Sequence, residues 1–147
     1  KTDLNIYLMT FERTEFIHES LASLLSNKKN FNFNLIISDN SKTNNVNNFL
    51  KKFFPEIKYI KYDFSEINSQ TKHFNEIIKN NNSKYIMMFH DDDILSEISI
   101  EIIYKYLLTS EDIVCVAPNS YKIKNNKIIY SRINRMKEDH LIFKKKK

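Results

Sequence analysis

Three consecutive aspartates, Asp91, Asp92 and Asp93, follow an apolar run at residues 85–89. Two unit charges about 4 Å apart repel by roughly 1 kcal/mol in water and by about 4 kcal/mol at an effective dielectric of 20. A divalent cation removes this conflict, because Mg²⁺ and Mn²⁺ prefer carboxylate and phosphate oxygens as ligands. The alternative is a solvated acidic turn that caps a helix beginning near Ser96. The position after a buried strand favours the cation site.

Two other polar segments also follow apolar runs. Residues 4–9 lead into Thr-Phe-Glu-Arg at 10–13, and residues 34–38 lead into Asp-Asn-Ser at 39–41. Helices alternate with these runs, which predicts a mainly parallel sheet with right-handed crossovers. Ligands of such sheets bind beyond the carboxyl ends of the strands. A strand order of 3-2-1-4 would bring all three polar segments to one crevice.

The remaining pattern predicts an α/β fold with a C-terminal hairpin. Further strands are expected at residues 58–62 and 113–117, and the continuous apolar run at 85–89 is typical of a strand covered on both faces. Helices are expected from the cap Thr14, over 44–54, over 71–79 and from the cap Ser96. Residues 121–123 and 127–130 flank an Asn-Asn pair, which indicates the hairpin.

Composition limits the function classes. The 147 residues predict one domain over 1–130 and a basic extension over 131–147 that is truncated or disordered. The absence of glycine excludes glycine-dependent phosphate loops. Four of the lysines behind the net charge of +5 form the run at 144–147, so specific nucleic-acid binding is not required. The lone Cys115 reads as a core residue of a cytoplasmic protein, and the lysine run could contact the inner membrane surface.

The chain resembles the family-2 type of GT-A glycosyltransferases over roughly residues 3 to 120. The resemblance is carried by residues 6–13, 35–41 and 83–93, in that order and at that spacing. It implies transfer of a sugar from a nucleotide-sugar donor, commonly UDP-linked, to a saccharide or lipid-linked acceptor. It also implies Mn²⁺ or Mg²⁺ as cofactor.

The resemblance assigns roles to residues on the nucleotide side of the expected site. Thr10 and Phe11 would line the base pocket, with Phe11 stacking on the base. Asp39 would accept a hydrogen bond from the base. Arg13 and Lys72 would contact the diphosphate; the alternative for each is a side chain that is simply exposed.

On the metal side, the resemblance makes Asp92 the principal metal ligand, with Asp93 helping through water. Asp91 would face the ribose or the metal. His90 stands where many relatives have aspartate, and it either binds metal or phosphate or has a structural role. His73 is interpreted as a solvated histidine on a helix surface.

The sequence departs from the family where an acceptor half would follow, and the acidic pair at 138–139 is the only one after residue 112. Either the chain is a fragment, or it is a short product that binds the nucleotide-sugar without turnover. A phosphoacceptor signalling domain is the other alternative, but such domains carry an acidic pair after the first strand, where this chain has Thr10 and Phe11. The sugar, the acceptor and the catalytic base are not identified.

Overall fold

The computed structural model describes residues 3–118, 120–125, 127–131 and 140–144. The chain divides into two compact units, Lys1–Glu97 and Ile98–Lys147. The domain boundary expected after residue 130 stays a prediction, because residues 132–139 lie outside the described part of the chain.

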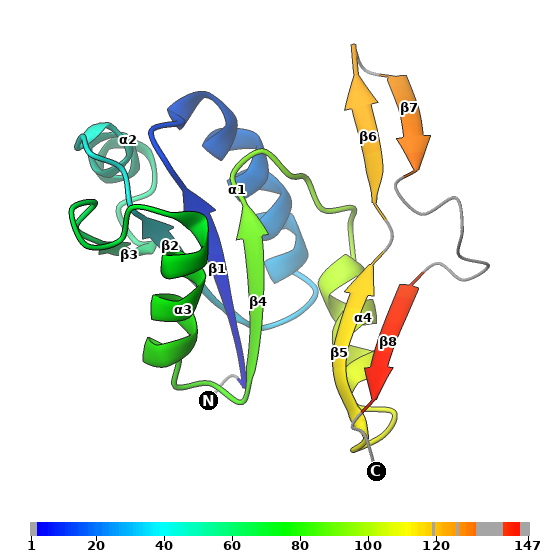
Figure 1. Ribbon diagram of the computed structural model, residues 1–147. Helices are drawn as coiled ribbons and strands as arrows, with labels where there is room; N and C mark the ends of the chain where they lie inside the picture. Colours follow the sequence, from blue (N-terminus) through cyan, green and yellow to red (C-terminus); the bar gives the residue numbers. More distant parts are fainter. Residues whose placement is uncertain (1–2, 119, 126, 132–139, 145–147) are drawn as a thin grey trace. The chain divides into compact units, whose positions relative to one another are not determined.

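The N-terminal unit is a parallel sheet with helices on both faces (Figure 1). Its strands are β1 (Leu4–Thr10), β2 (Asn34–Asp39), β3 (Lys58–Lys61) and β4 (Tyr85–His90), and its helices are α1 (Thr14–Lys28), α2 (Asn45–Phe53) and α3 (Gln70–Asn80). The strand order is β3-β2-β1-β4, and each of these pairings is parallel. The α/β fold and the strand order expected from the sequence are confirmed.

The core lies against both faces of the central strand β1, which is buried along its whole length. On one face, Tyr7 and Met9 pack with Ile36 of β2 and Ile77 of α3. Because side chains alternate along a strand, Ile6 faces the opposite side, where α1 and α2 lie (Figure 1). Burial of one such side chain contributes about 1.5–3 kcal/mol, so the centre of the sheet is firmly held.

The register of the sheet brings the strand ends together. Thr10 of β1 pairs with Asp39 of β2, and Met9 pairs with His90 of β4. The loops that follow β1, β2 and β4 therefore leave the sheet side by side at its carboxyl edge.

Strand β4 is less buried than its apolar sequence predicts. Phe89 is buried, but Ile86 is 37% exposed and the residues around it are half-buried. Within the described residues β4 pairs only with β1 and forms an edge of the sheet. The expectation of a strand covered on both faces is therefore wrong.

Two of the predicted helix caps are also wrong. Helix α1 begins at Thr14 itself, and the preceding Arg13 makes no capping bond because a guanidinium has no acceptor to offer to the helix amides. Helix α4 (Ser99–Leu107) begins after Ile98, which has a left-handed backbone with φ of 61°. Instead of capping this helix, Ser96 offers its carbonyl oxygen to the Asn27 amide at 3.0 Å.

The described part of the C-terminal unit contains α4 and four strands. These are β5 (Ile113–Pro118), β6 (Tyr121–Lys124), β7 (Lys127–Ser131) and β8 (His140–Lys144). Strands β6 and β7 form the expected hairpin, in which Asn125 takes a left-handed φ of 51°. Strand β5 pairs antiparallel with β8, and Cys115 is exposed, so its assignment to the core is wrong. In the described part of the chain, no helix has the length and apolarity needed to cross a membrane.

Candidate functional site

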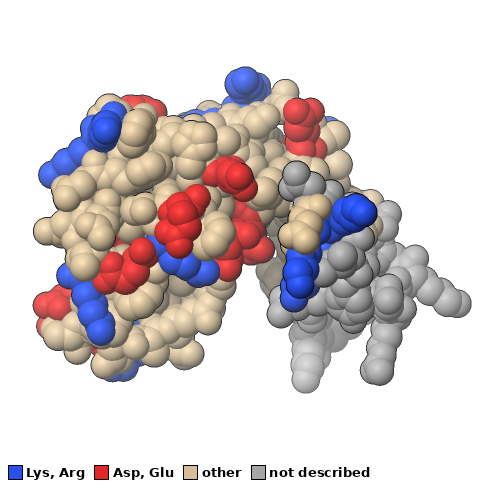
Figure 2. All heavy atoms as spheres, turned by 90° about the horizontal axis from the view of Figure 1, so that it is seen from above, with Lys and Arg blue, Asp and Glu red and all other residues tan. Residues whose placement is uncertain are grey.

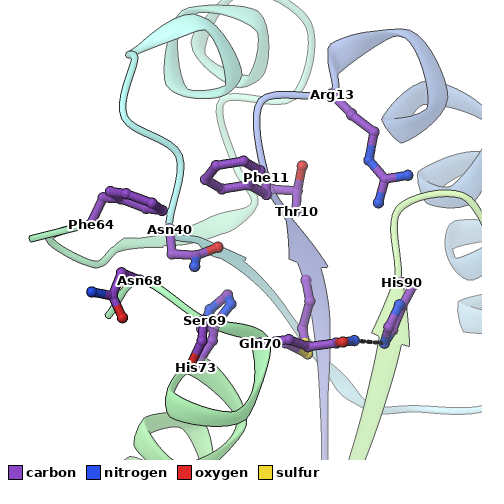
Figure 3. A pocket seen from close by; sticks show the side chains of 11 residues that line it. Thr10, Phe11, Arg13, Asn40, Phe64, Asn68, Ser69, Gln70, His73 and His90 are labelled. Carbon is purple, nitrogen blue, oxygen red and sulfur yellow. Dashed lines mark hydrogen bonds between the residues drawn. The ribbon is translucent and has the colours of Figure 1, made fainter. Parts of the chain in front are cut away.

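A hollow of about 670 Å³ lies at the carboxyl edge of the parallel sheet (Figure 3). Its lining comes from the ends of β1, β2 and β4 and from the segment that leads into α3: Met9, Thr10, Phe11, Arg13, Asn40, Phe64, Asn68, Ser69, Gln70, His73 and His90. This volume is within the range of small-molecule sites. Figure 2 looks onto this edge and shows acidic side chains gathered there, with a basic side chain between them.

The acidic turn, residues 90–93, is fixed through its backbone. The Asp91 amide donates to the Met9 carbonyl at 3.1 Å. The Ser20 hydroxyl of α1 lies 2.5 Å from the carbonyl oxygen of Asp91 and 2.8 Å from that of Asp93. The turn is therefore held by β1 and α1 without using its carboxylates.

Arg13 bridges two of the three carboxylates. Its guanidinium nitrogens lie 2.9 Å from Asp91 Oδ1 and 3.0 Å from Asp92 Oδ2. The Asp91 side chain is 1% exposed, whereas that of Asp92 is 46% exposed. Burial raises the pKa of Asp91, while the Thr10 hydroxyl and the Arg13 charge act in the opposite direction.

The contact between Arg13 and Asp91 is an ion pair without hydrogen-bond alignment. The Thr10 hydroxyl and the Phe11 amide are near enough to Asp91 to lower its pKa, but within the described residues neither donates a hydrogen bond of good geometry to its carboxylate oxygens. Buried carboxylates are normally both charge-paired and hydrogen-bonded. Asp91 is therefore a buried carboxylate beside the pocket whose nearby donors are poorly aligned with its oxygens.

The Asp39 cluster, which comprises Asp39, Ser41, Tyr59 and Lys61, shows the opposite condition. Asp39 is fully buried. Its Oδ1 accepts from the Ser41 amide at 2.7 Å and from the Ser41 hydroxyl, while its Oδ2 accepts from the Tyr59 hydroxyl at 2.7 Å and the Lys61 ammonium at 3.3 Å. Burial, followed by the bond to Asp39, raises the pKa of Tyr59. Asp39 does not line the hollow itself.

Glu12 ties the first strand end to the second. It has a left-handed φ of 59°, and its amide donates to the Ser41 hydroxyl at 2.7 Å. Its carboxylate accepts from the amides of Lys42 and Thr43 at 2.6 and 3.0 Å and from the Thr43 hydroxyl. The Thr43 hydroxyl bond is the main cause that lowers the pKa of Glu12. With Arg13 bound to the acidic turn, these bonds show that the three polar segments converge, as the sequence predicts.

One wall of the hollow is aromatic. The rings of Phe11 and Phe64 lie 5.4 Å apart at 34°, and the Lys42 ammonium lies 4.7 Å above Phe64. Phe11 is 39% exposed, so a face is accessible to a ligand. The side-chain amide of Asn40 donates to the Ile67 carbonyl at 3.0 Å, which ties this wall to the end of β2.

Two histidines line the hollow from different elements. His73 is buried, not solvated as expected, because its Nε2 lies 2.7 Å from the Ser38 hydroxyl and Tyr62 covers its ring. Burial lowers its pKa to about 4, against an opposing effect of Asp39. His90 Nε2 lies 3.2 Å from the Gln70 amide.

The other residues assigned from the sequence lie as follows. Lys72 does not line the hollow, and its ammonium donates to the Glu66 carbonyl at 3.3 Å. The Asp93 side chain is exposed, and its backbone holds the turn. Over the described ranges, no three His, Cys, Asp or Glu side chains are grouped so as to hold a metal. The acidic pair at 138–139 lies outside them.

Sequence reasoning gave no role to Phe64, Asn68, Ser69 or Gln70. Phe64 carried a signal, since it is the one phenylalanine in the mostly polar segment 62–69 between β3 and α3. Ser69 carried a second signal, because a serine directly before a helix is a typical cap. In the structure it does cap α3, since its hydroxyl accepts from the Lys72 amide at 3.3 Å.

The fold and the hollow define an open-sheet α/β domain, a class in which ligands bind beyond the carboxyl ends of the strands. Residues 6–147 match the model of glycosyl transferase family 2, and the chain belongs to this family. No curated protein matches the sequence significantly.

Solved structures of GT-A transferases share the fold. The mannosyltransferase PcManGT from Pyrobaculum calidifontis, in complex with GDP-Man and Mn²⁺, matches 82% of this chain with a TM-score of 0.63 and 10% identity. TarS 1-349 from S. aureus, in complex with UDP, matches 92% with a TM-score of 0.67 and 15% identity. The chain spans 36% and 40% of the length of these two structures.

Proposed function

We propose that the chain is the donor-binding part of a glycosyltransferase that moves a sugar from a nucleotide-sugar, with UDP as the expected nucleotide, to a saccharide or lipid-linked acceptor. The observation that carries this proposal is a hollow lined by the aromatic wall, by His90 and by Arg13, whose guanidinium binds the carboxylates of Asp91 and Asp92 just outside the lining. Membership of family 2 supports it, as do the GDP-Man and UDP in the two similar structures.

The aromatic wall suits a nucleobase. Phe11 would stack on the base next to Phe64, and the Asn40 amide and the Thr10 hydroxyl offer polar groups at its edge. Asp39 would accept a hydrogen bond from the base only in place of a donor that now binds it. The exchangeable donors are the Tyr59 hydroxyl and the Lys61 ammonium, which share its Oδ2.

The acidic turn suits a divalent cation with a diphosphate. Mg²⁺ and Mn²⁺ are usually held by one or two protein carboxylates together with phosphate oxygens. Asp92 is accessible, and the buried Asp91 has oxygens without a well-formed hydrogen bond in the described residues. Asp92 would be the principal ligand, with Asp93 acting through water. When bound, the cation supplies Lewis-acid stabilisation of the departing nucleoside diphosphate. Arg13 and Lys72 would contact the phosphates.

The saccharide or lipid-linked acceptor is inferred from the family resemblance alone. No catalytic base is assigned among the described residues. A cytoplasmic location and a contact between the lysine run at 144–147 and an anionic membrane remain proposals from the sequence.

Isothermal titration calorimetry tests the donor site. UDP or GDP with Mn²⁺ is expected to bind the wild type, and Asp92→Ala is expected to weaken binding by roughly 30-fold, about 2 kcal/mol, because a charged contact is lost. Chelation of the metal should have a similar effect. Asp3→Ala is the matched control, because Asp3 is exposed and precedes β1 at the opposite edge of the sheet. Equal binding by wild type and Asp92→Ala would reject this site.

Hydrolysis of the nucleotide-sugar separates the enzyme from a module that only binds. Mn²⁺-dependent release of the sugar, lost in Asp92→Ala, supports an active transferase. Nucleotide binding without release or transfer supports the inactive nucleotide-sugar-binding module, which the partial span of the similar structures also permits.

A further inference from the structure

We infer that Arg13 is the resident counter-ion of the acidic turn, which a divalent cation displaces and which then becomes available to the diphosphate. This inference rests on the proposed function, because it concerns the same cation and the same nucleotide. It adds a specific exchange: the ligand's metal and the protein's own guanidinium compete for Asp91 and Asp92.

The geometry places the guanidinium at the cation position. Its two terminal nitrogens each face a different carboxylate, at 2.9 Å from Asp91 Oδ1 and 3.0 Å from Asp92 Oδ2. A cation that bound the same two oxygens would lie within about 4 Å of the guanidinium carbon, where like charges repel strongly. The two cannot both occupy this position.

The surroundings of Asp91 explain why a counter-ion is needed. Its side chain is 1% exposed and has no well-formed hydrogen bond within the described residues. An unpaired charge in such a place is strongly unfavourable. The ion pair with Arg13 is therefore what balances a buried Asp91 carboxylate before a metal arrives.

Arg13 itself has room to leave. Its side chain is 41% exposed, and it also lines the hollow that would hold the nucleotide (Figure 3). Apart from the two carboxylates, its guanidinium lies 6.0 Å from the Phe16 ring, a contact that allows rotation. Departure from the acidic turn therefore requires a change of rotamer only.

The exchange predicts opposite effects on two ligands. In Arg13→Gln, Mn²⁺ alone no longer competes with a guanidinium and is expected to bind about fivefold to tenfold more tightly. UDP or GDP in saturating Mn²⁺ is expected to bind the same variant about fivefold to tenfold more weakly, because a charged phosphate contact is lost. A role for Arg13 in folding alone would weaken both ligands together.

Calorimetry on the full chain measures both affinities at neutral pH, with circular dichroism and melting temperature as checks of folding. Lys29→Gln, at an exposed position on the far end of α1, controls for the loss of one positive charge. Arg13→Lys keeps the charge but cannot bridge two carboxylates, so a smaller gain in Mn²⁺ affinity is expected. If Arg13→Gln does not fold, Arg13→Lys replaces it as the test variant.

An unchanged or weaker Mn²⁺ affinity in a folded Arg13 variant would overturn the inference, as would the absence of Mn²⁺ binding in wild type and variant alike. Failure of the proposed function has a different signature, namely no binding of UDP or GDP to the wild type in Mn²⁺. A gain in Mn²⁺ affinity in Arg13→Gln would then still establish the exchange.

Discussion

The Asp39 cluster and the acidic turn each contain one fully buried carboxylate, that of Asp39 and that of Asp91. The two carboxylates differ in the partners that they bind. In the Asp39 cluster both oxygens of Asp39 accept hydrogen bonds, from Ser41 in the loop after β2 and from Tyr59 and Lys61 of β3. In the acidic turn the equally buried Asp91 has an ion pair with Arg13 and no well-formed hydrogen bond among the described residues.

This difference distinguishes a buried carboxylate that stabilises the fold from one whose oxygens are kept for a ligand. A fully hydrogen-bonded buried carboxylate makes a local structure rigid and stabilises the fold. A buried carboxylate with only an exchangeable counter-ion contributes less to stability and keeps its oxygens for another partner. The Asp39 cluster is therefore complete without a ligand, whereas in the proposed function the acidic turn is completed by the cation and the nucleotide.

The largest expected effect compares one carboxylate from each region. Asp39→Asn should lower the free energy of unfolding by about 3 kcal/mol, because it breaks a buried ion pair and leaves the Tyr59 hydroxyl and Lys61 poorly matched. Asp92→Asn should change it by less than about 1 kcal/mol, because its partly exposed ion pair is screened by solvent. Urea unfolding monitored by circular dichroism measures both values. A larger loss of unfolding free energy in Asp92→Asn than in Asp39→Asn would contradict the view that the Asp39 cluster contributes more to stability.

The next effect concerns the pH dependence of stability below neutrality. The pKa of His73 falls from 6.5 to about 4 on folding, so the unfolded chain binds a proton before the folded one does. Its contribution is complete above pH 6.5 and is lost as the pH falls toward 4, by roughly 3 kcal/mol. Thermal unfolding across this range should be less pH-dependent in His73→Gln than in the wild type.

The smallest effect concerns Glu12, the link between the ends of β1 and β2. Glu12→Ala should lower the unfolding free energy by about 1 kcal/mol, because the bonds to Lys42 and Thr43 are lost. Glu12→Gly should cost about 1 kcal/mol less than Ala, since glycine adopts a φ of 59° without steric strain. Chemical denaturation of the two variants tests this. Equal values for Ala and Gly would mean that the left-handed backbone carries no strain.

The fold was predictable from the sequence because its signals are repeated and local. Apolar runs alternate with amphipathic segments, and the handedness of crossovers leaves few strand orders. The convergence of the polar segments after β1, β2 and β4 follows from that order. The hairpin of β6 and β7 followed from the Asn-Asn pair between two strand-like segments.

The side-chain pairing in the site was not predictable, because it depends on register and rotamer. Tyr59 and Lys61 share one face of β3, but only the pairing of Asp39 with Lys61 shows that they reach this carboxylate. His73 looked solvated because a helical pattern does not reveal that Ser38 and Tyr62 cover it. The ion pair of Arg13 with the acidic turn depends on a long side chain that has many rotamers.

The central position of β1 has a consequence for how the gene can vary. β1 pairs with β2 on one side and with β4 on the other, so its register positions both the Asp39 cluster and the acidic turn. One residue gained or lost within β1 would shift the two partner loops by about 3.3 Å and turn its side chains to the opposite face. Insertions in the segment between β3 and α3 would alter the pocket wall but would leave the pairing of β1 with β2 and β4 unchanged.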